Sequence, residues 1–343
     1  MKINKLLFPL FLCLFVLQIK AQDFKLGKVS IAELQEKAHP KDPSANAAVL
    51  FKKGEVRFEY SPETGFSVIT TVEARIKIYT KEGYNWANQE VDYRVGSSKE
   101  NVDFSNAVTY NLVDGKIEKT KLKKEGEFLG KVNRYWDRKK ITMPNVKEGS
   151  VIEYQYTVRS SNIGSLRDWN FQTSIPVNYS EYKTYIPEYF IYQTNQKGYV
   201  FPKVTVEKNP NKITFTSKER SGGDRIGNTK TTFSTETIDF IEAKTTHVGE
   251  NLPAMKEEAY VNNIDNYTSS ISYELSMTKY PNEPLKPYSS DWNAIVKTIY
   301  DYEDFGPELN KTGYFEDDLK TVLSGLTTAD EKIKAILNYV KTN

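Results

Sequence analysis

The chain has few of the residues on which much enzyme chemistry depends. Its 343 residues include one cysteine, Cys13, and two histidines, His39 and His247. The thiolate is the reactive form of cysteine, and two distant histidines leave little for a Ser-His-Asp arrangement or a zinc site. The sequence also lacks a Gly-x-Ser-x-Gly motif and a phosphate-binding loop. We therefore expect no catalytic residue, no metal site and no cofactor within this chain.

An excess of charge of either sign is also missing. The chain has 47 Lys and Arg residues against 45 Asp and Glu residues, which gives a formal net charge of +2. A nucleic-acid-binding protein usually carries a clear excess of positive charge. We therefore expect no nucleic-acid partner.

The one long apolar run lies at the N-terminus, over residues 6–17. It is too short to span a bilayer as a permanent helix. Two lysines precede it, and Ile19 and Ala21 stand at the −3 and −1 positions of a cleavage site, as in a signal peptide. We expect residues 1–21 to be removed on export to the periplasm or cell surface of a Gram-negative bacterium.

Cleavage at this site would remove Cys13 and leave a mature chain without thiols or disulfides. The alternative is lipidation at Cys13. That processing requires a small residue before the cysteine, and Leu12 stands there.

Between residues 48 and 280 the sequence alternates with the period of two that is typical of β-strands. The clearest example is 68–78, where apolar and polar residues alternate to predict a long half-buried strand. Residues 151–159 repeat the pattern. No helical stripe occurs in this region, so we expect a mainly β fold, a large antiparallel β-sandwich.

Turn residues support antiparallel pairing. Asp114-Gly115 lies between two alternating runs and predicts a type I′ hairpin. Asn209-Pro-Asn-Lys212 separates two further runs and predicts a second turn.

The flanking segments have helical signals. In residues 22–47, Ser30 and Glu33 form a capping-box pattern that predicts a short helix. Residues 281–288 contain three prolines and predict an extended linker. Residues 289–343 have helical periodicity, and the last helix begins with a second capping box, Thr328-x-x-Glu331. We expect this part to begin a second, incomplete domain, with an exposed apolar stripe on its last helix.

One segment mixes aromatic and basic residues closely enough to suggest a binding surface. Arg134, Tyr135, Trp136 and Arg138 occur within five positions. Aromatic rings among cations could contact sugar rings or an acidic peptide. The alternative is that these aromatics pack within the sandwich and the cations line its edge.

The strand region also resembles a known family. It is similar to the uncharacterised N-terminal β domain of exported bacterial transglutaminase-like proteins. The segment 74–88 fits the long first strand of that domain. The other residues that carry the resemblance form three groups: Met143, Pro144, Val146, Gly149, Ser150, Ile152, Glu153 and Tyr154; Trp169, Phe171 and Gln172; and Pro176, Val177, Ser180 and Tyr182.

The resemblance implies a role and a partner. In that family the β domain precedes a papain-related core with a catalytic Cys, His and Asp, whose opening helices resemble residues 330–343. Those catalytic positions have no counterpart here. The chain is then expected to be an accessory β domain that positions a protein, peptide or glycan substrate for a transglutaminase-like domain in cis. The alternative is a free-standing module that binds glycans or peptides.

Overall fold

The computed structural model describes residues 24–96, 99–221, 230–281, 283–288, 292–302 and 305–342. The expected signal peptide, Cys13 and Asn343 lie outside the described residues. The chain is 50% strand and 17% helix, so the expected mainly β fold with antiparallel strands and short C-terminal helices is confirmed, and its strands form a large multi-sheet structure. Contacts divide it into two units, Met1–Glu188 with Thr194–Tyr273, and Tyr189–Gln193 with Glu274–Asn343.

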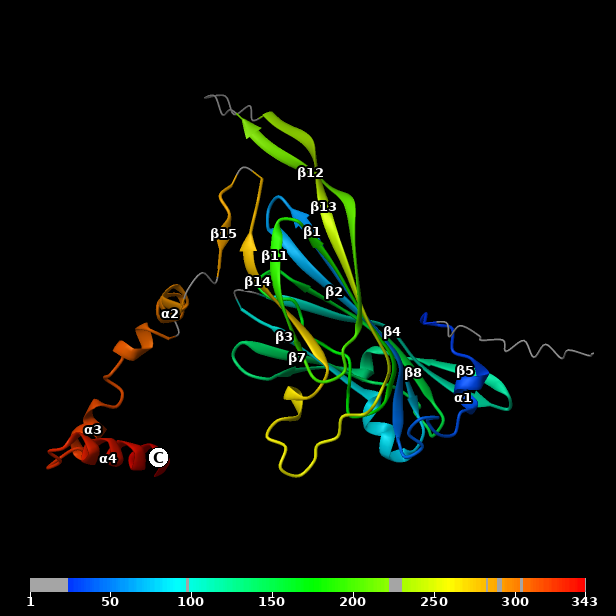
Figure 1. Cartoon of the computed structure of the whole chain (residues 1–343), viewed down its shortest axis with the longest axis horizontal. Coiled ribbons are helices and arrows are strands. Elements are labelled where there is room, and N and C mark those ends of the chain that lie inside the picture. The colour runs from blue at the N-terminus through cyan, green and yellow to red at the C-terminus, as the bar shows by residue number, and fades with distance from the viewer. Residues whose placement is uncertain are drawn as a thin grey trace, which may run out of the picture. The chain divides into compact units, whose positions relative to one another are not determined.

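The first unit is built on an eight-stranded sheet with the order β12-β13-β10-β1-β2-β8-β4-β5 (Figure 1). Six of the seven pairings in this sheet are antiparallel, and β1 pairs with β10 in parallel, so the sheet is mixed. In chain order the strands are β1 (Ala47–Ser61), β2 (Gly65–Ile78), β4 (Glu100–Val113), β5 (Lys116–Lys121), β8 (Val151–Ser160), β10 (Val177–Pro187), β12 (Lys203–Ser221) and β13 (Lys230–Leu252).

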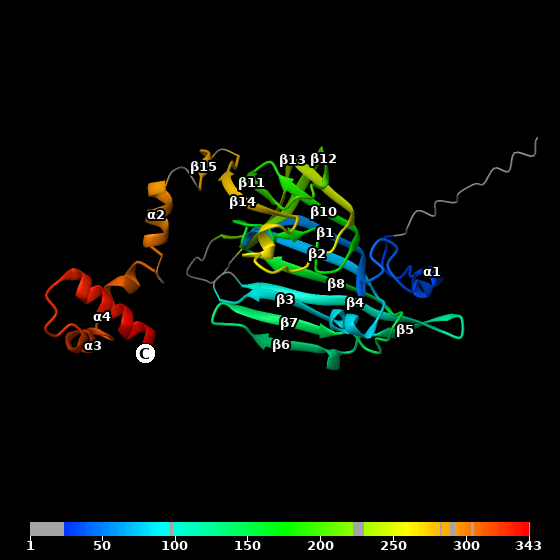
Figure 2. The same cartoon turned by 60° about the horizontal axis from the view of Figure 1, so that its bottom comes forward.

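A three-stranded sheet, in the order β3-β7-β6, forms a second layer (Figure 2). Its strands are β3 (Asn88–Arg94), β7 (Trp136–Thr142) and β6 (Glu127–Lys131). Val91 of β3 packs with Val102 of β4 and Val158 of β8. This apolar contact places the small sheet over one face of the β4–β8 region.

The remaining strands are short or lie in the third sheet, where β11 (Phe190–Lys197), β14 (Ser270–Thr278) and β15 (Lys286–Pro287) are neighbours. The two-residue β9 (Trp169–Asn170) also pairs with β14. Short 3₁₀ helices occur at Lys81–Ala87, Lys124–Gly126, Ile264–Asn266 and Pro307–Asn310.

One of the two predicted turns is confirmed and the other is wrong. Asp114 and Gly115 both have positive φ, as a type I′ turn requires, and join β4 to β5. Residues 209–212 do not turn, because β12 runs through them and Pro210 lies opposite Ile241. β12 is the edge strand of the sheet, where a proline can be accommodated because its missing N–H need not pair with a neighbouring strand.

The N-terminal segment covers part of the large sheet. Helix α1 (Ile31–Gln35) is capped as predicted, since Ser30 Oγ accepts from the Glu33 N–H and Glu33 Oε2 accepts from the Ser30 N–H. Leu34 of this segment and Val29 form an apolar cluster with Tyr110 and Val151.

The covered face also buries charge. Arg75 and Lys77 occupy polar positions of the alternation over 68–78, which predicted a half-buried strand, but they are 1% and 0% exposed. Arg75 bonds Glu153 at 2.7 Å and Glu33 at 2.8 Å. The ammonium of Lys77 donates to the carbonyls of Leu34 and Gly149. Strand β2 is therefore buried on both faces here because residues 24–36 lie over it.

The second unit contains α2 (Trp292–Tyr300), α3 (Glu316–Val322) and α4 (Ala329–Thr342). The capping box of α4 is present, with Thr328 Oγ1 accepting from the Glu331 N–H at 3.3 Å. Ile333, Leu337 and Val340 are 63%, 51% and 69% exposed, so α4 carries an apolar stripe with little cover.

Part of the proline-rich segment forms a short strand. It was expected as a linker over 281–288, yet Lys286 and Pro287 pair with Thr278 and Met277 of β14. The boundary between the two units falls within β11 and β14 rather than at the prolines.

Candidate functional site

A cavity of about 370 Å³ lies on the face of the large sheet that carries Lys52 and Val72. Small-molecule sites usually have volumes of about 300–1,000 Å³, so this cavity is at the small end of the range. The large sheet supplies its floor, the ends of β3 and β7 one wall, and the loop before β9 another. The lining residues are Lys52, Thr70, Val72, Arg94, Glu100, Trp136, Tyr156, Asn162, Ser165, Leu166, Arg167, Asp168, Trp169 and Tyr182.

Trp169 is fixed in the wall of the cavity by three contacts. Its indole N–H donates to Ser180 Oγ at 3.0 Å, and its ring stacks on Tyr182 with centroids 5.1 Å apart. A Cβ at Gly54 would lie 2.5 Å from Trp169, so the close approach of the ring to β1 requires glycine there. The Tyr182 hydroxyl donates to the Arg167 carbonyl, which secures the loop before β9.

These contacts connect two of the sequence motifs on which the resemblance rests. Trp169 belongs to one motif, and Ser180 and Tyr182 belong to another, so the two groups meet in one packed cluster. Gln172 bonds the Ser269 N–H and the Pro253 carbonyl. Of these motif residues, Trp169 and Tyr182 line the cavity.

Two cations at the cavity are paired with aromatic rings. The Lys52 ammonium lies 4.2 Å from the centre of the Trp169 ring, and the Arg94 guanidinium lies 5.3 Å from the centre of the Trp136 ring. Lys52 is half-buried, and burial lowers its pKa to about 8. Within the described part of the chain, neither cation forms an ion pair with a carboxylate.

A third cation is already neutralised. Arg167 pairs with Glu100 at 3.0 Å and also donates to the Asp92 carbonyl at 2.7 Å. Glu100 accepts in addition from the backbone N–H of Arg94. The buried Nε of Arg167 has no hydrogen-bond acceptor among the described residues.

The four residues chosen from the sequence take different places. Trp136 lines the cavity. Arg138, on the same strand, pairs with Asp92 at 2.6 Å and with Glu90 at 2.8 Å.

The other two residues of that group precede the strand. The Arg134 guanidinium lies 4.4 Å from the centre of the Tyr135 ring, and Tyr135 is 42% exposed. The structure therefore does not place Arg134, Tyr135 or Arg138 in the lining of this cavity, and their binding role stays a prediction.

Sequence reasoning missed Lys52, Arg94 and Trp169 as members of one site. Trp169 belongs to one of the sequence motifs, which could have identified it as a site residue. Lys52 and Arg94 had no such signal, since they lie far from Trp136 and from each other in sequence and meet only through the sheet topology.

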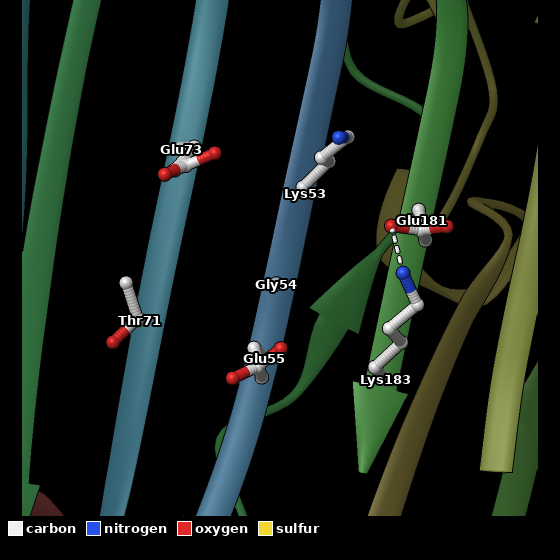
Figure 3. Close-up of a pocket in the computed structure, with 7 residues that line it drawn as sticks. All are labelled: Lys53, Gly54, Glu55, Thr71, Glu73, Glu181 and Lys183. Atoms are coloured by element: carbon white, nitrogen blue, oxygen red, sulfur yellow. Dashed lines mark hydrogen bonds and ion pairs between the residues drawn. The ribbon is translucent and has the colours of Figure 1, made fainter. Parts of the chain in front are cut away.

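A second depression lies on the opposite face of the same strands (Figure 3). Successive residues of a strand point to opposite faces, so Lys53 lies here while Lys52 lines the cavity. Its lining is mainly charged, and Glu181 pairs with Lys183 at 2.7 Å. Carboxylates and ammonium groups alternate across this surface, which is typical of a solvated sheet face.

The histidines occupy structural positions. His39 Nε2 lies 2.7 Å from Asn178 Oδ1, and His39 Nδ1 accepts from the Asp42 N–H. His247 is 4% exposed and packs beside Tyr182 and Tyr273, and burial lowers its pKa. Among the described residues, His, Cys, Asp and Glu form no cluster of three that could hold a metal, and no helix is long and apolar enough to cross a membrane.

Comparison with known proteins supports the fold. Residues 66–222 match DUF3857, a family described as a domain of unknown function with solved structure. This segment includes every lining residue of the cavity except Lys52. A search of curated proteins finds no match.

One solved structure shares much of the architecture. It is a protein from Parabacteroides distasonis described as a putative protease, with a TM-score of 0.53 and 13% sequence identity. The likeness covers 87% of this chain and 50% of that protein, so the chain spans half of its length. At this identity the likeness shows a common fold alone.

Proposed function

We propose that this chain is the non-catalytic, substrate-positioning β region of an exported transglutaminase-like acyltransferase or peptidase. The catalytic Cys, His and Asp are supplied by residues outside this chain. The observation that carries the proposal is the shared architecture, which spans 87% of this chain but only half of a protein described as a putative protease. The other half of such a protein has room for a catalytic domain.

The chemistry of the chain supports an accessory role. Its single cysteine lies in the predicted signal peptide. His39 and His247 are held by an asparagine and by aromatic packing, respectively. A Cys-His-Asp acyl-transfer site needs a thiolate beside a base, so the proposal places that site elsewhere.

The family motifs support a positioning role. Two of the motif residues, Trp169 and Tyr182, line the cavity, and a third, Ser180, accepts a hydrogen bond from the Trp169 indole. A binding cavity on a rigid sheet can hold a substrate segment in a fixed orientation, and such positioning accelerates the reaction of a neighbouring catalytic group.

The test is the coding sequence downstream of the Asn343 codon. We expect an open reading frame that encodes a Cys, then a His, then an Asp, and a longer protein whose activity is abolished when that Cys is changed to Ala. Iodoacetamide should label the same Cys in the longer protein. A stop codon directly after Asn343, confirmed in the transcript, would overturn the proposal.

A second function is favoured by the cavity itself, which brings Trp136 and Trp169 together in a lining that a ligand could fill. A free-standing binding module for peptides or glycans would retain that ligand without a catalytic domain. Pull-down and glycan-array binding by the exported chain, lost in Trp136→Ala with the circular dichroism spectrum unchanged, would support this alternative. Binding that survives the substitution would count against it.

A further inference from the structure

The cavity has two cations that contact aromatic rings and have no acidic partner within the described residues. Lys52 contacts the Trp169 ring and Arg94 contacts the Trp136 ring, and neither forms an ion pair within the described residues. A charged group that is removed from water is stabilised when a counter-ion and hydrogen bonds replace the lost solvation. Lys52 is half-buried and loses part of its solvation, whereas Arg94 is exposed and keeps its donors open to a ligand. The two cations therefore favour an anion in this cavity.

The charge of the lining indicates how much negative charge the cavity can accept. Lys52, Arg94 and Arg167 face two carboxylates, Glu100 and Asp168. This leaves an excess of one positive charge. A single carboxylate balances it, whereas a polyanion would be repelled by the two acidic side chains.

The rings argue against a sugar platform. A sugar ring needs an open aromatic face, but Trp169 is 3% exposed and stacks on Tyr182. Trp136 is half-buried, and the Arg94 guanidinium lies over it. The rings instead form apolar walls that hold the cations in place.

We propose that this cavity binds a carboxylate of a peptide, with Lys52 and Arg94 contacting the carboxylate and Trp136 contacting the adjacent apolar side chain. The guanidinium of Arg94 can bond both carboxylate oxygens. Arg167 is half-buried and paired with Glu100, so it lines the cavity without offering a free charge. The inference rests on the proposed function in one respect, which is that the peptide belongs to the substrate of the catalytic partner.

The primary test is calorimetric titration of the full exported chain with blocked dipeptides. Acetyl-Phe-Glu-amide carries a side-chain carboxylate, acetyl-Phe-Gln carries a C-terminal carboxylate, and acetyl-Phe-Gln-amide carries neither. We expect one or both of the acids to bind about tenfold or more tightly than the uncharged peptide, as for the loss of one charge-assisted hydrogen bond. The tighter acid identifies the source of the carboxylate.

Substitutions assign the site. Arg94→Ala and Lys52→Met should each weaken binding of the tighter acid by about tenfold. Arg138→Ala is the matched control, because this arginine lies on β7 beside Trp136 but pairs with Asp92 and Glu90. Its affinity should equal that of the unchanged chain. Thermal melts establish that each variant is folded, and Lys52→Arg, which keeps the charge, should retain most of the affinity if Lys52→Met is destabilised.

Binding should also depend on pH. A carboxylate ligand needs the charged form of Lys52, so affinity should fall as pH rises through about 8, the pKa to which burial lowers this group. The other charged groups that line the cavity beside Lys52 are Arg94, Arg167, Glu100 and Asp168. The Lys52→Arg variant should lose the pH dependence and retain the binding.

Three results would overturn the proposal. They are equal affinity for the acids and the uncharged peptide, binding that Arg94→Ala and Lys52→Met leave unchanged, and binding of glucuronate with no binding of either acidic peptide. The outcomes that would overturn the proposed function are different from those that would overturn the carboxylate site. A stop codon after Asn343 with intact peptide binding would leave the carboxylate site standing, whereas a downstream Cys, His and Asp with no peptide binding would remove the site alone.

Discussion

The two faces of the large sheet differ in whether their cations are paired with carboxylates. On the face under residues 24–36, Arg75 is bonded to Glu153, Glu33 and the Lys25 carbonyl, so each of its nitrogens has an acceptor. On the other face, Lys52 is half-buried against an aromatic ring and has no acidic partner within the described residues. Both side chains come from neighbouring strands, β1 and β2.

The difference separates structure from binding. A cation whose nitrogens all bond acceptors in the fold is not available to bind a ligand. Arg75 is such a cation, and its bonds hold the N-terminal segment on the sheet. A cation left without a partner beside a cavity keeps its capacity to bind. Pairing, rather than burial alone, distinguishes the two roles.

The largest expected effect comes from removing the buried ion pair of Arg75, on the face that residues 24–36 cover. Arg75→Met leaves the Glu153 carboxylate buried at 1% exposure without its cation. Removal of one partner of a buried ion pair costs about 3–5 kcal/mol, so the free energy of unfolding in urea should fall by that amount. Arg159→Ala is the control, because Arg159 pairs with Glu59 at an exposed site and should cost about 0–1 kcal/mol. Equal losses in the two variants would contradict the comparison.

The next effect comes from the cavity wall. Gly54→Ala places a Cβ 2.5 Å from Trp169 and 2.9 Å from Tyr182. The ring must shift, and overpacking of this kind costs about 1–3 kcal/mol in unfolding free energy. Gly130→Ala on β6 is the matched control, since its Cβ would meet no atom within 4 Å. A Gly54→Ala protein as stable as the control, with unchanged tryptophan fluorescence, would show that Trp169 is not held as described.

The sequence could predict much of this fold because local signals agreed with it. The alternation over 68–78, the Asp114-Gly115 turn and the capping boxes at Ser30 and Thr328 each depend on neighbouring residues only. The wrong turn at Pro210 illustrates the limit. A proline disfavours a strand only when its N–H must pair, and the edge position of β12 depends on the whole sheet.

The site was less accessible to sequence reasoning for the same physical cause. Trp136 was identified because it lies in an unusual local mixture of aromatic and basic residues. Lys52 and Trp169 meet because β1 pairs with β10 in parallel and Ser180 accepts from the indole. No local pattern encodes a contact between residues more than a hundred positions apart.

Lys52, on the face that carries the cavity, should also make the stability of the chain depend on pH. The folded pKa of Lys52 is about 8, below the value of 10.5 for a free lysine. Between these values the unfolded chain binds more protons, so this group makes stability rise with pH over that range. Lys52→Met removes the contribution, so urea unfolding at about pH 7.5, 9 and 10.5 should show a shallower rise in stability than in the unchanged chain. Parallel curves would mean that Lys52 is solvated in the folded state.

The smallest expected effect belongs to Arg138, one of the residues that the sequence favoured for binding. It bonds Asp92 and Glu90, but its side chain is 42% exposed, and ion pairs of this kind contribute about 0–1 kcal/mol. Its pairing with Asp92 holds the pKa of that carboxyl below its ordinary value. Arg138→Ala should therefore raise the pKa of Asp92, measurable by NMR titration, while the free energy of unfolding changes little. A change of more than about 2 kcal/mol would place Arg138 among the groups that hold the sheets together, with Arg75, and would remove it as a neutral control for the cavity.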